Sequence, residues 1–571
     1  MKRRGLKSII LVMTICIPCF LMSINTYIGS NSTKISEDID DTVNLKISAT
    51  FDTTEIDDFP GSPNNWSWAK SQGICTGSGT QLDPYVIDGN IFHPTPAWDC
   101  LRIFNSRKYF IISNCEFRWA PDVFSGIYIV NVTNGRIINN EFHHNMYGIY
   151  VLSMNDSLIS ENNFYSNNGD GTFFHDCHGN TITNNNLTLN SWQGMWMEYS
   201  SNNVLSGNLA YNNNFSGMYL YECDYSTVND NMLNFNNFSG LTIYDNTFAA
   251  IENNEIKENI REGLYFYGNL DSGVTGNAIH GNGWYGITAL RTNESLIANN
   301  NVYLNLIDGI FITDSHGNSI TNNNLSLNAL QGMWMEYSSN NIISGNLAHN
   351  NSESGLFLYE CDYSTVTDNT LNFNGYSGLR IWSNIFTSID NNEMKENIRE
   401  GMYFRSNLNC SIIKNNIKNN IWDGIFARFS NGTLITENYF NNNAIGGVGT
   451  SGLRFDASCK LNKIYLNCFN NSVNAIDDGI NNQWDNGIKG NYWADYTGLD
   501  TNNNGIGDIP YNITGSAGGQ DNFPLMVCPL PLIEVVEEIP SFNLYIVISV
   551  IIFSIGIIWI IKRKKHQVIH I

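Results

Sequence analysis

Charge is scarce in this chain, and positive charge is its scarcest part. Charged residues make up 15% of the 571 residues, well below the usual quarter, and 30 Lys and Arg stand against 53 Asp and Glu, for a net charge of −23. A nucleic-acid surface needs clustered Lys and Arg, so this balance argues against a nucleic-acid partner. Leu, Ile, Val and aromatic residues are frequent enough to exclude the composition of a disordered protein.

Long helical patterns and metal-binding cysteine pairs are also missing. No segment has an apolar period long enough for a leucine-rich or helical solenoid, and no four-strand blade signature of a propeller is present. The twelve cysteines show no CxxC or Cys/His spacing typical of a zinc site. The chain is therefore neither a common helical repeat protein nor a zinc-stabilised domain.

A glycine returns at an almost constant spacing, 22 residues once and 23 otherwise. The segment Gln193–Tyr199 recurs letter for letter as Gln331–Tyr337, 138 residues or six periods later, which indicates a block duplication of about residues 176–270 as 314–408. Repeats of this length are stacked supersecondary units rather than a globular core. The glycines are Gly126, Gly148, Gly171, Gly194, Gly217, Gly240, Gly263, Gly286, Gly309, Gly332, Gly355, Gly378, Gly401 and Gly424.

The residues after each glycine alternate as they do in a β-strand. The first and third are apolar, as in Met195 and Met197, and the second is usually aromatic, as in Trp196. Asparagine recurs earlier in each period, from Asn163 to Asn438, and suits sharp corners where stacked amides can pair. Several short strands per turn of ~23 residues predict an all-β fold, a right-handed parallel β-helix over about residues 83–475.

The aromatic residue of each turn is expected to point outward, because its two neighbours point inward. A row of exposed rings matches the flat faces of sugars and predicts a carbohydrate-binding surface. Rings that only stack on one another and stiffen the sheet are an equally good interpretation. The predicted ligand-binding residues are Tyr150, Phe173, Trp196, Tyr219, Phe311, Trp334 and Phe357.

Acidic residues accompany the aromatic residues in both copies of the duplicated block. Paired carboxylates hydrolyse glycosidic bonds at separations of about 5–9.5 Å, which neighbouring turns could supply. A polar exterior is expected of any solenoid, so a polysaccharide hydrolase or lyase is the alternative to a binding or structural role. The catalytic candidates are Asp176, Glu198, Glu222, Glu336 and Glu360, with His175, Asp245 and Asp314 beside them.

A loop near the C-terminal end has the front half of a calcium-binding sequence. Oxygen-bearing side chains occupy its positions 1, 3, 5 and 9, and Gly505 occupies position 6, but Tyr511 stands where a bidentate glutamate is expected. The pattern predicts calcium, and a metal-free turn rich in Asn and Asp is the alternative. The predicted metal-site residues are Asp500, Asn502, Asn504, Ile506 and Asp508.

Copper is a second metal to consider, since methionine thioethers suit Cu(I). Met195 and Met197, with their copies Met333 and Met335, fall on the inward positions of predicted strands, where core packing is the ordinary explanation. No cluster of histidine and methionine repeats with them. The residues alone therefore favour packing over copper binding.

The two ends of the chain carry targeting signals. Residues 1–30 join a basic start to an apolar run, as a signal peptide or an uncleaved signal anchor does, and the polar residues 31–82 are expected to be a loose leader. Residues 476–526 are expected to cap the last turn, and 527–541 form a Pro- and Glu-rich linker. Residues 542–561 predict a single transmembrane helix and 562–571 a basic cytoplasmic tail, which places the rod outside the cell membrane.

Such a location permits disulfides and glycosylation. Cys100 with Cys115, or Cys459 with Cys468, are the pairs we consider, whereas Cys223 and its copy Cys361 are expected in the core. Glycosylation sequons begin at residues such as Asn131, Asn186 and Asn324.

The segment Gly148–Asn168 resembles the coil of NosD-type right-handed β-helix proteins, which belong to the carbohydrate-binding and sugar-hydrolase β-helix class. Gly490–Tyr496, Asp500–Tyr511 and Asp521–Leu525 together are similar to the terminal motif of that group, and the resemblance covers about Tyr85 to Met526. It implies a β-helix outside the cytoplasm. Founding members assist copper-site maturation of nitrous oxide reductase, but this chain departs from them in its C-terminal apolar segment, its duplication and its lack of a copper constellation.

The expectation is therefore a membrane-anchored surface protein that binds carbohydrate or cell-envelope partners, or that acts structurally. A polysaccharide hydrolase or lyase and a copper-maturation accessory protein are the two alternatives.

Overall fold

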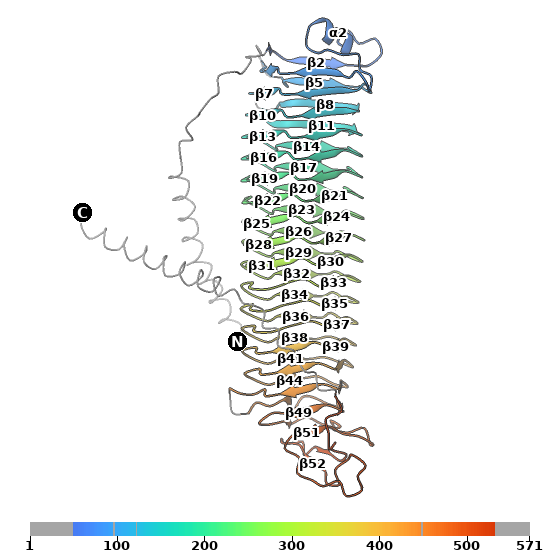
Figure 1. Cartoon of the computed structure of the whole chain (residues 1–571), viewed down its shortest axis with the longest axis vertical. Coiled ribbons are helices and arrows are strands. Elements are labelled where there is room, and N and C mark those ends of the chain that lie inside the picture. The colour runs from blue at the N-terminus through green and yellow to red at the C-terminus, as the bar shows by residue number, and fades with distance from the viewer. Residues whose placement is uncertain (1–48, 95–97, 121–122, 447–448, 531–571) are drawn as a thin grey trace, which may run out of the picture. The chain divides into compact units, whose positions relative to one another are not determined.

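The computed structural model describes residues 49–94, 98–120, 123–446 and 449–530, which form stacked β-strand turns along one axis (Figure 1). The predicted signal segment, the apolar segment 542–561, the basic tail and most of the linker lie outside these residues. Among the described residues, no helix is long and apolar enough to cross a membrane.

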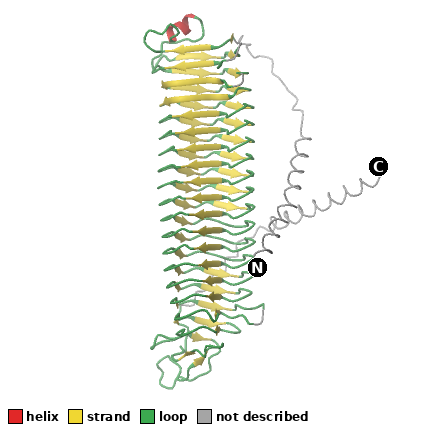
Figure 2. Cartoon of the chain, turned by 180° about the vertical axis from the view of Figure 1, so that it is seen from behind, coloured by secondary structure: helices red, strands yellow, loops and turns green. Residues whose placement is uncertain are grey.

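Each turn contributes short strands to parallel sheets that run the length of the stack (Figure 2). Sheet A extends from β1 (Thr50–Phe51) to β31 (Asn301–Tyr303) and again from β40 (Glu393–Lys395) to β51 (Tyr492–Trp493), and sheet C extends from β3 (Tyr85–Asp88) to β48 (Lys463–Tyr465). The strands of sheet B, in the order of stacking, are β2 (Thr54–Asp57), β5 (Leu101–Phe104), β8 (Ser125–Thr133), β11 (Tyr147–Asn155), β14 (Thr172–His175), β17 (Met195–Glu198), β20 (Met218–Tyr221), β23 (Leu241–Tyr244), β26 (Leu264–Tyr267), β29 (Ile287–Leu290), β32 (Ile310–Thr313), β34 (Met333–Glu336), β36 (Leu356–Tyr359), β38 (Leu379–Trp382), β41 (Met402–Arg405), β44 (Ile425–Arg428), β47 (Leu453–Phe455) and β50 (Ala475–Asp477).

The predicted alternation of inward and outward residues is confirmed. Met195 and Met197 of β17 are fully buried, while Trp196 between them remains partly exposed. Stacked phenylalanines fill the interior near the start of the rod, with ring centroids 4.9 Å apart between Phe117 and Phe142 and 4.7 Å apart between Phe142 and Phe164. Because each turn buries its apolar face against the next, the core is a continuous column.

A buried column of asparagines holds one corner of the turns. The Nδ2 group of Asn277 donates to Asn300 Oδ1 at 3.0 Å and to the carbonyl of Ile251 at 2.9 Å. The amide therefore pairs with the next asparagine of the column and with the backbone. At five turns the stacked asparagine is one residue earlier than the sequence pattern predicts, which places Asn162, Asn185, Asn300, Asn323 and Asn415 in the column. The column comprises Asn140, Asn162, Asn185, Asn208, Asn231, Asn254, Asn277, Asn300, Asn323, Asn346, Asn369, Asn392, Asn415, Asn438, Asn467 and Asn491.

The rod begins earlier than predicted. Strand β2 pairs in register with β5, so residues 54–57 belong to the first turn and the expectation of a loose leader is wrong for residues 49–82. Helix α2 (Trp66–Ser71) follows, and the buried ring of Trp66 lies 4.9 Å from Tyr85 and 5.2 Å from Phe110. The leader is polar in composition, but its few apolar side chains cover the open end of the core.

Aromatic side chains close the other end of the rod. Trp484 and Trp493 are buried, and the Trp493 ring stacks on Tyr511 at 4.2 Å. Strands β52 (Tyr511–Asn512) and β53 (Gln520–Asp521) form an antiparallel pair within this cap. The cap therefore supplies apolar rings to the last turn, whose inward face would otherwise meet water.

The disulfide differs from both predicted pairs. Cys468 bonds to Cys528, whereas Cys100, Cys115 and Cys459 are free and buried. The cap folds back so that residue 528 lies beside β49 (Cys468–Asn470), a proximity that sequence spacing does not reveal. The predicted burial of Cys223 and Cys361 is confirmed.

Candidate functional site

The outer face of sheet B gathers most of the predicted site residues. It presents the second and fourth residues after each repeat glycine, and the residue before that glycine lies beside them and is buried in most turns. In the turn of Gly194 these are Gln193, Trp196 and Glu198. Strict register places each such residue beside its equivalent in the next turn, about 4.8 Å away.

The predicted aromatic residues are brought together on this face. Phe173, Trp196 and Tyr219 lie in one register line, with ring centroids 5.4 Å and 5.6 Å apart. In the second copy, Trp334 lies 5.5 Å from Phe311 and 5.7 Å from Phe357. The rings contact one another, as the stiffening interpretation requires, and most of them also keep a partly exposed face, as the binding interpretation requires.

The predicted acids divide into two groups. Glu198 and Glu336 lie on the face itself and are half-buried, and burial, with a smaller contribution from Asp314, raises the pKa of the Glu336 carboxyl. Each of the others follows a strand, in a left-handed backbone conformation at an exposed turn; these residues are Asp176, Glu222, Asp245, Asp314 and Glu360. The second group therefore borders the face rather than lying on it.

Two predicted acids have a histidine partner in the first copy: Asp176 pairs with the partly exposed His178 at 3.1 Å, and Glu198 pairs with His175. The Nδ1 atom of His175 lies 2.9 Å from Glu198 Oε1, across two adjacent turns. The residue that aligns with Glu336 in the preceding turn is Thr313, which carries no charge. The two copies thus share a carboxylate but differ in its partner.

Buried carboxyl groups that the sequence analysis missed lie beside the aromatic residues. Asp170 and Asp308 precede repeat glycines, are fully buried, and accept hydrogen bonds from the backbone N–H groups of Gln193 at 2.8 Å and Gln331 at 2.6 Å. Burial raises the pKa of each carboxyl to about 7. The second oxygen of each, Oδ2, has no hydrogen-bond partner among the described residues.

Other acids occupy the same position in later turns. Asp423 accepts a hydrogen bond from the backbone N–H of Ser451 at 2.6 Å, and burial raises its pKa to about 7. Glu400 accepts the hydroxyl proton of Ser377 at 2.9 Å, and burial raises its pKa as well. A signal was present in the sequence, because the position before the glycine otherwise holds mostly Ser, Gln or Tyr.

Two equivalent groups of residues can therefore be defined. Within the part of the chain that the structure describes, Trp196 Nε1 and Trp334 Nε1 are buried without a hydrogen-bond partner, as are Asp170 Oδ2 and Asp308 Oδ2. Each group places unpaired donor and acceptor atoms beside aromatic rings. Cluster 1 is Tyr147, Asp170, Phe173, Gln193, Trp196 and Glu198, and cluster 2 is Tyr285, Asp308, Phe311, Gln331, Trp334 and Glu336.

The predicted calcium loop lies in the cap and is exposed. Asp500 accepts the backbone N–H groups of Asn504 at 3.1 Å and Gly505 at 2.8 Å, and Asn504 Oδ1 accepts that of Ile506 at 2.9 Å. Asp508 accepts the Thr501 hydroxyl at 2.7 Å, which lowers the pKa of Asp508. Both carboxylates of the loop, Asp500 and Asp508, therefore accept hydrogen bonds from other groups of the loop itself.

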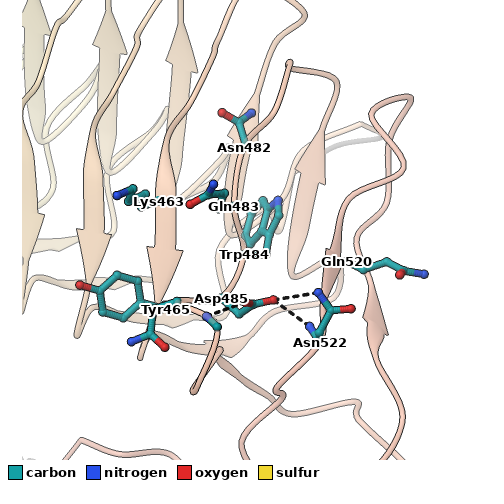
Figure 3. Close-up of a pocket in the computed structure, with 10 residues that line it drawn as sticks. Lys463, Tyr465, Asn482, Gln483, Trp484, Asp485, Gln520 and Asn522 are labelled. Carbon is teal, nitrogen blue, oxygen red and sulfur yellow. Dashed lines mark hydrogen bonds between the residues drawn. The ribbon is translucent and has the colours of Figure 1, made fainter.

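A shallow recess of about 560 Å³ lies between sheet C and the cap (Figure 3). Its lining is mostly polar, and Asp485 Oδ2 accepts the backbone and side-chain N–H groups of Asn522, each at 3.0 Å. Lys463 and Tyr465 line its rim. None of the predicted site residues lies in this recess.

Comparison with known families now identifies the class. The model of the right-handed β-helix family matches residues 72–232 and 216–360, and the chain belongs to that family. Residues 332–498 match the family described as periplasmic copper-binding protein (NosD), so the chain is a NosD-type right-handed β-helix protein. A search of curated proteins finds no match.

Several solved structures are similar at low sequence identity. The A-module of the mannuronan C-5 epimerase AlgE6 of Azotobacter vinelandii is 11% identical, with 66% of this chain and 91% of that one covered and a TM-score of 0.33. An alginate lyase from Paenibacillus is 14% identical (38% and 85% covered, TM-score 0.30), and the periplasmic alginate epimerase AlgG is 13% identical (72% and 83% covered, TM-score 0.28).

The copper that the NosD description implies does not fit the donor groups of this chain. Met333 and Met335 lie in the matched segment, but both are fully buried and face the packed core. Burial raises the pKa of the Cys361 thiol to about 12, which keeps it protonated and unsuited to a metal. The described residues contain no group of three or more His, Cys, Asp and Glu side chains placed to hold a metal.

Proposed function

We propose that this protein is a surface rod that binds polysaccharide along the outer face of sheet B, with clusters 1 and 2 as its principal contacts. The observation that carries the proposal is the recurrence, six turns apart, of rings beside unpaired hydrogen-bonding atoms. Buried polar groups are almost always paired within a protein, so unpaired groups in both clusters favour a partner from outside.

The chemistry of the clusters suits a sugar. Aromatic faces pack against the apolar face of a sugar ring, and its hydroxyl groups both donate and accept hydrogen bonds. In cluster 1 the Trp196 ring and the Glu198 carboxylate are partly exposed and can contact a sugar. Trp196 Nε1 and Asp170 Oδ2 are buried, and they would pair with its hydroxyl groups only if binding uncovers them. The straight stack of turns would let one polymer lie along several of them.

We further propose that the rod is anchored in the cell membrane through residues 542–561 and lies on the extracellular or periplasmic side. The apolar length of that segment and the Lys and Arg residues after it support a single span with a cytoplasmic tail. The periplasmic description of the matched NosD family agrees with this location.

The test is retention of the detergent-solubilised full-length protein on a panel of immobilised cell-envelope and plant polysaccharides. The double variant Trp196→Ala/Trp334→Ala should lose most of its retention, because both clusters lose their largest ring. Tyr225→Ala/Tyr363→Ala is the matched control, since these copies of one another are each 57% exposed on a different stack. Equal loss in both double variants would contradict the proposal.

One observation supports a second candidate function, a polysaccharide hydrolase or lyase. Burial raises the pKa of the Asp170 carboxyl in cluster 1 to about 7, and a carboxyl with such a pKa can transfer protons near neutral pH. Glu198 of the same cluster pairs with His175 in the preceding turn. New reducing or unsaturated ends in the same panel, abolished by Asp170→Asn or Glu198→Gln, would establish catalysis. Glu336→Gln is the control, because cluster 2 has Thr313 in place of the histidine.

Calcium in the 500–508 loop is also a proposal. Asp500, Asn502, Asn504 and Asp508 provide the hard oxygen donors that Ca²⁺ prefers, and the carbonyl of Ile506 is the expected backbone donor. Binding there would stabilise the cap.

A further inference from the structure

The outer face of sheet B changes character in its last turns. From β38 to β47 it carries arginines among its rings, although the chain has only 30 Lys and Arg and a net charge of −23. Arg380, Tyr403, Phe426 and Arg454 follow one another in one register line, and Trp382, Arg405 and Arg428 form the next line. We call Arg380, Arg399, Arg405, Arg428 and Arg454, with the rings between them, the arginine patch.

The acids near the patch do not neutralise it. Asp456 pairs with Arg428 at 2.9 Å, and among the described residues this is the only ion pair within 4.0 Å that the patch makes. Glu400 and Asp423 lie below the arginines, but both are buried, and the pKa of Asp423 is raised to about 7 despite the attraction of Arg454. Asp478 also attracts Arg454, as Glu400 attracts Arg399 and Arg380. The five guanidinium groups of the patch still outnumber these four carboxyl groups.

The arginines are held on aromatic rings rather than on carboxylates. The Arg380 guanidinium lies 4.3 Å from the ring centre of Phe357, and that of Arg405 lies 4.5 Å from the ring centre of Trp382. Such contacts orient a guanidinium and leave its edge donors free. The Nε groups of Arg380, Arg405 and Arg454 have no hydrogen-bond partner among the described residues.

Two of the arginines also oppose each other directly. Arg405 and Arg428 occupy the same register position on adjacent strands, where like charges repel. Nothing in the turn geometry requires this arrangement, because most other turns hold uncharged residues at the same position. Asp456 offsets part of this repulsion at Arg428, and a bound anion that contacts the guanidinium groups would offset the rest.

The duplication supplies an internal comparison. Six turns earlier, the positions of Arg380, Arg405 and Arg428 hold Thr242, Tyr267 and Leu290. The acid Asp245 likewise corresponds to Ser383, and one change runs the other way, from Arg291 to Phe429. Over these five positions the later turns are more positive by three charges on the same scaffold, while the packing positions between them stay apolar.

From this geometry we infer that the arginine patch is the binding site for an anionic polysaccharide, one whose sugars bear carboxylate or sulfate groups. The inference rests on the proposed function, since it assigns the charged sugars of the polymer to one end of the same face. Guanidinium forks pair with planar and tetrahedral oxyanions, and the interleaved rings accept the sugar faces. The equivalent turns six turns earlier lack these three arginines and should lack this preference.

The test compares binding of the full-length protein to polygalacturonate, dextran sulfate, unsubstituted dextran and single-stranded DNA. The variant Arg380→Thr/Arg405→Tyr/Arg428→Leu installs the residues of the first copy, which the same scaffold already accommodates. It should bind the charged polysaccharides at least tenfold more weakly, and the affinity of the unmodified protein should fall as salt is raised. The control Arg291→Phe, which removes one arginine outside the patch by the same kind of exchange, should stay within twofold.

The possible results separate the two proposals. Weaker binding to either charged polysaccharide supports the patch, and the probe that responds tells carboxylate from sulfate. Equal binding of the triple variant and the unmodified protein overturns the patch, as does tighter binding of single-stranded DNA than of both polysaccharides. Binding to dextran alone would support the proposed glycan-binding face and contradict the anionic site at the arginine patch. No binding to any polysaccharide would contradict both proposals.

Discussion

Asp170 and Asp308 lie six turns apart at one register position of sheet B, and each carboxylate accepts the backbone N–H of the glutamine in the next turn, at 2.8 Å and 2.6 Å. Neither makes an ion pair with any other described residue, so burial dominates and raises the pKa of both groups to about 7 from 3.8. An electrostatically costly group therefore recurs in two places, just before each copy of the duplicated block.

These aspartates should make stability depend on pH. A carboxyl whose pKa is raised in the folded state binds more protons there than in the unfolded state, so stability is greatest below about pH 4 and falls as pH rises to about 7. The loss should reach up to about 4 kcal/mol per aspartate. Asp170→Asn/Asp308→Asn should flatten the dependence of the urea midpoint on pH in this range, whereas Asp176→Asn, at an exposed turn, should not.

The asparagine column should be sensitive to a single substitution. Asn277→Ala removes the partner of the Asn254 amide and leaves Asn300 Oδ1 and the Ile251 carbonyl with fewer donors, all in the interior. Each buried group left unpaired costs roughly 1–3 kcal/mol, so the unfolding free energy should fall by about 3 kcal/mol or more. Asn237→Ala, which breaks an exposed amide pair at 3.1 Å, is the control and should cost under about 1 kcal/mol.

The disulfide should stabilise the cap. Cys468 and Cys528 close a loop with a sequence separation of 60, for which chain entropy predicts about 4 kcal/mol. Cys468→Ser/Cys528→Ser should lower the midpoint for exposure of Trp484 and Trp493, monitored by their fluorescence. Added reductant should reproduce the effect in the unmodified protein and do nothing further to the variant; peptide mapping that finds Cys459 bonded to Cys468 would contradict this pairing.

Calcium should act on the same cap. If the 500–508 loop binds Ca²⁺, millimolar calcium should raise the thermal midpoint of the cap by several degrees, and chelator should reverse the shift. Asp500→Asn/Asp508→Asn should abolish the response, because the loop loses both of its carboxylates. An identical response to magnesium, or no response to either ion, would argue for a metal-free turn.

The repeat period and the inward or outward direction of each strand residue could be predicted from the sequence, because alternation along a strand is a local property. Met197 had to face the core once Trp196 faced outward. The direction of a side chain does not, however, predict whether residues of neighbouring turns bury it. The burial of Asp170 could not be predicted from its local sequence, because it depends on residues one turn away, such as Tyr147 and Gln193, which are 23 residues distant in the chain.

The sequence by itself determined the fold class, the stacking axis and the line of rings, since a strict period leaves one way to bury the apolar positions. Tertiary structure decided which carboxyls lie among those rings, which cysteine meets Cys468, and where the arginines of later turns converge on one face. These depend on the register between turns and on the return path of the cap. Both are set by packing between residues that are far apart in the chain.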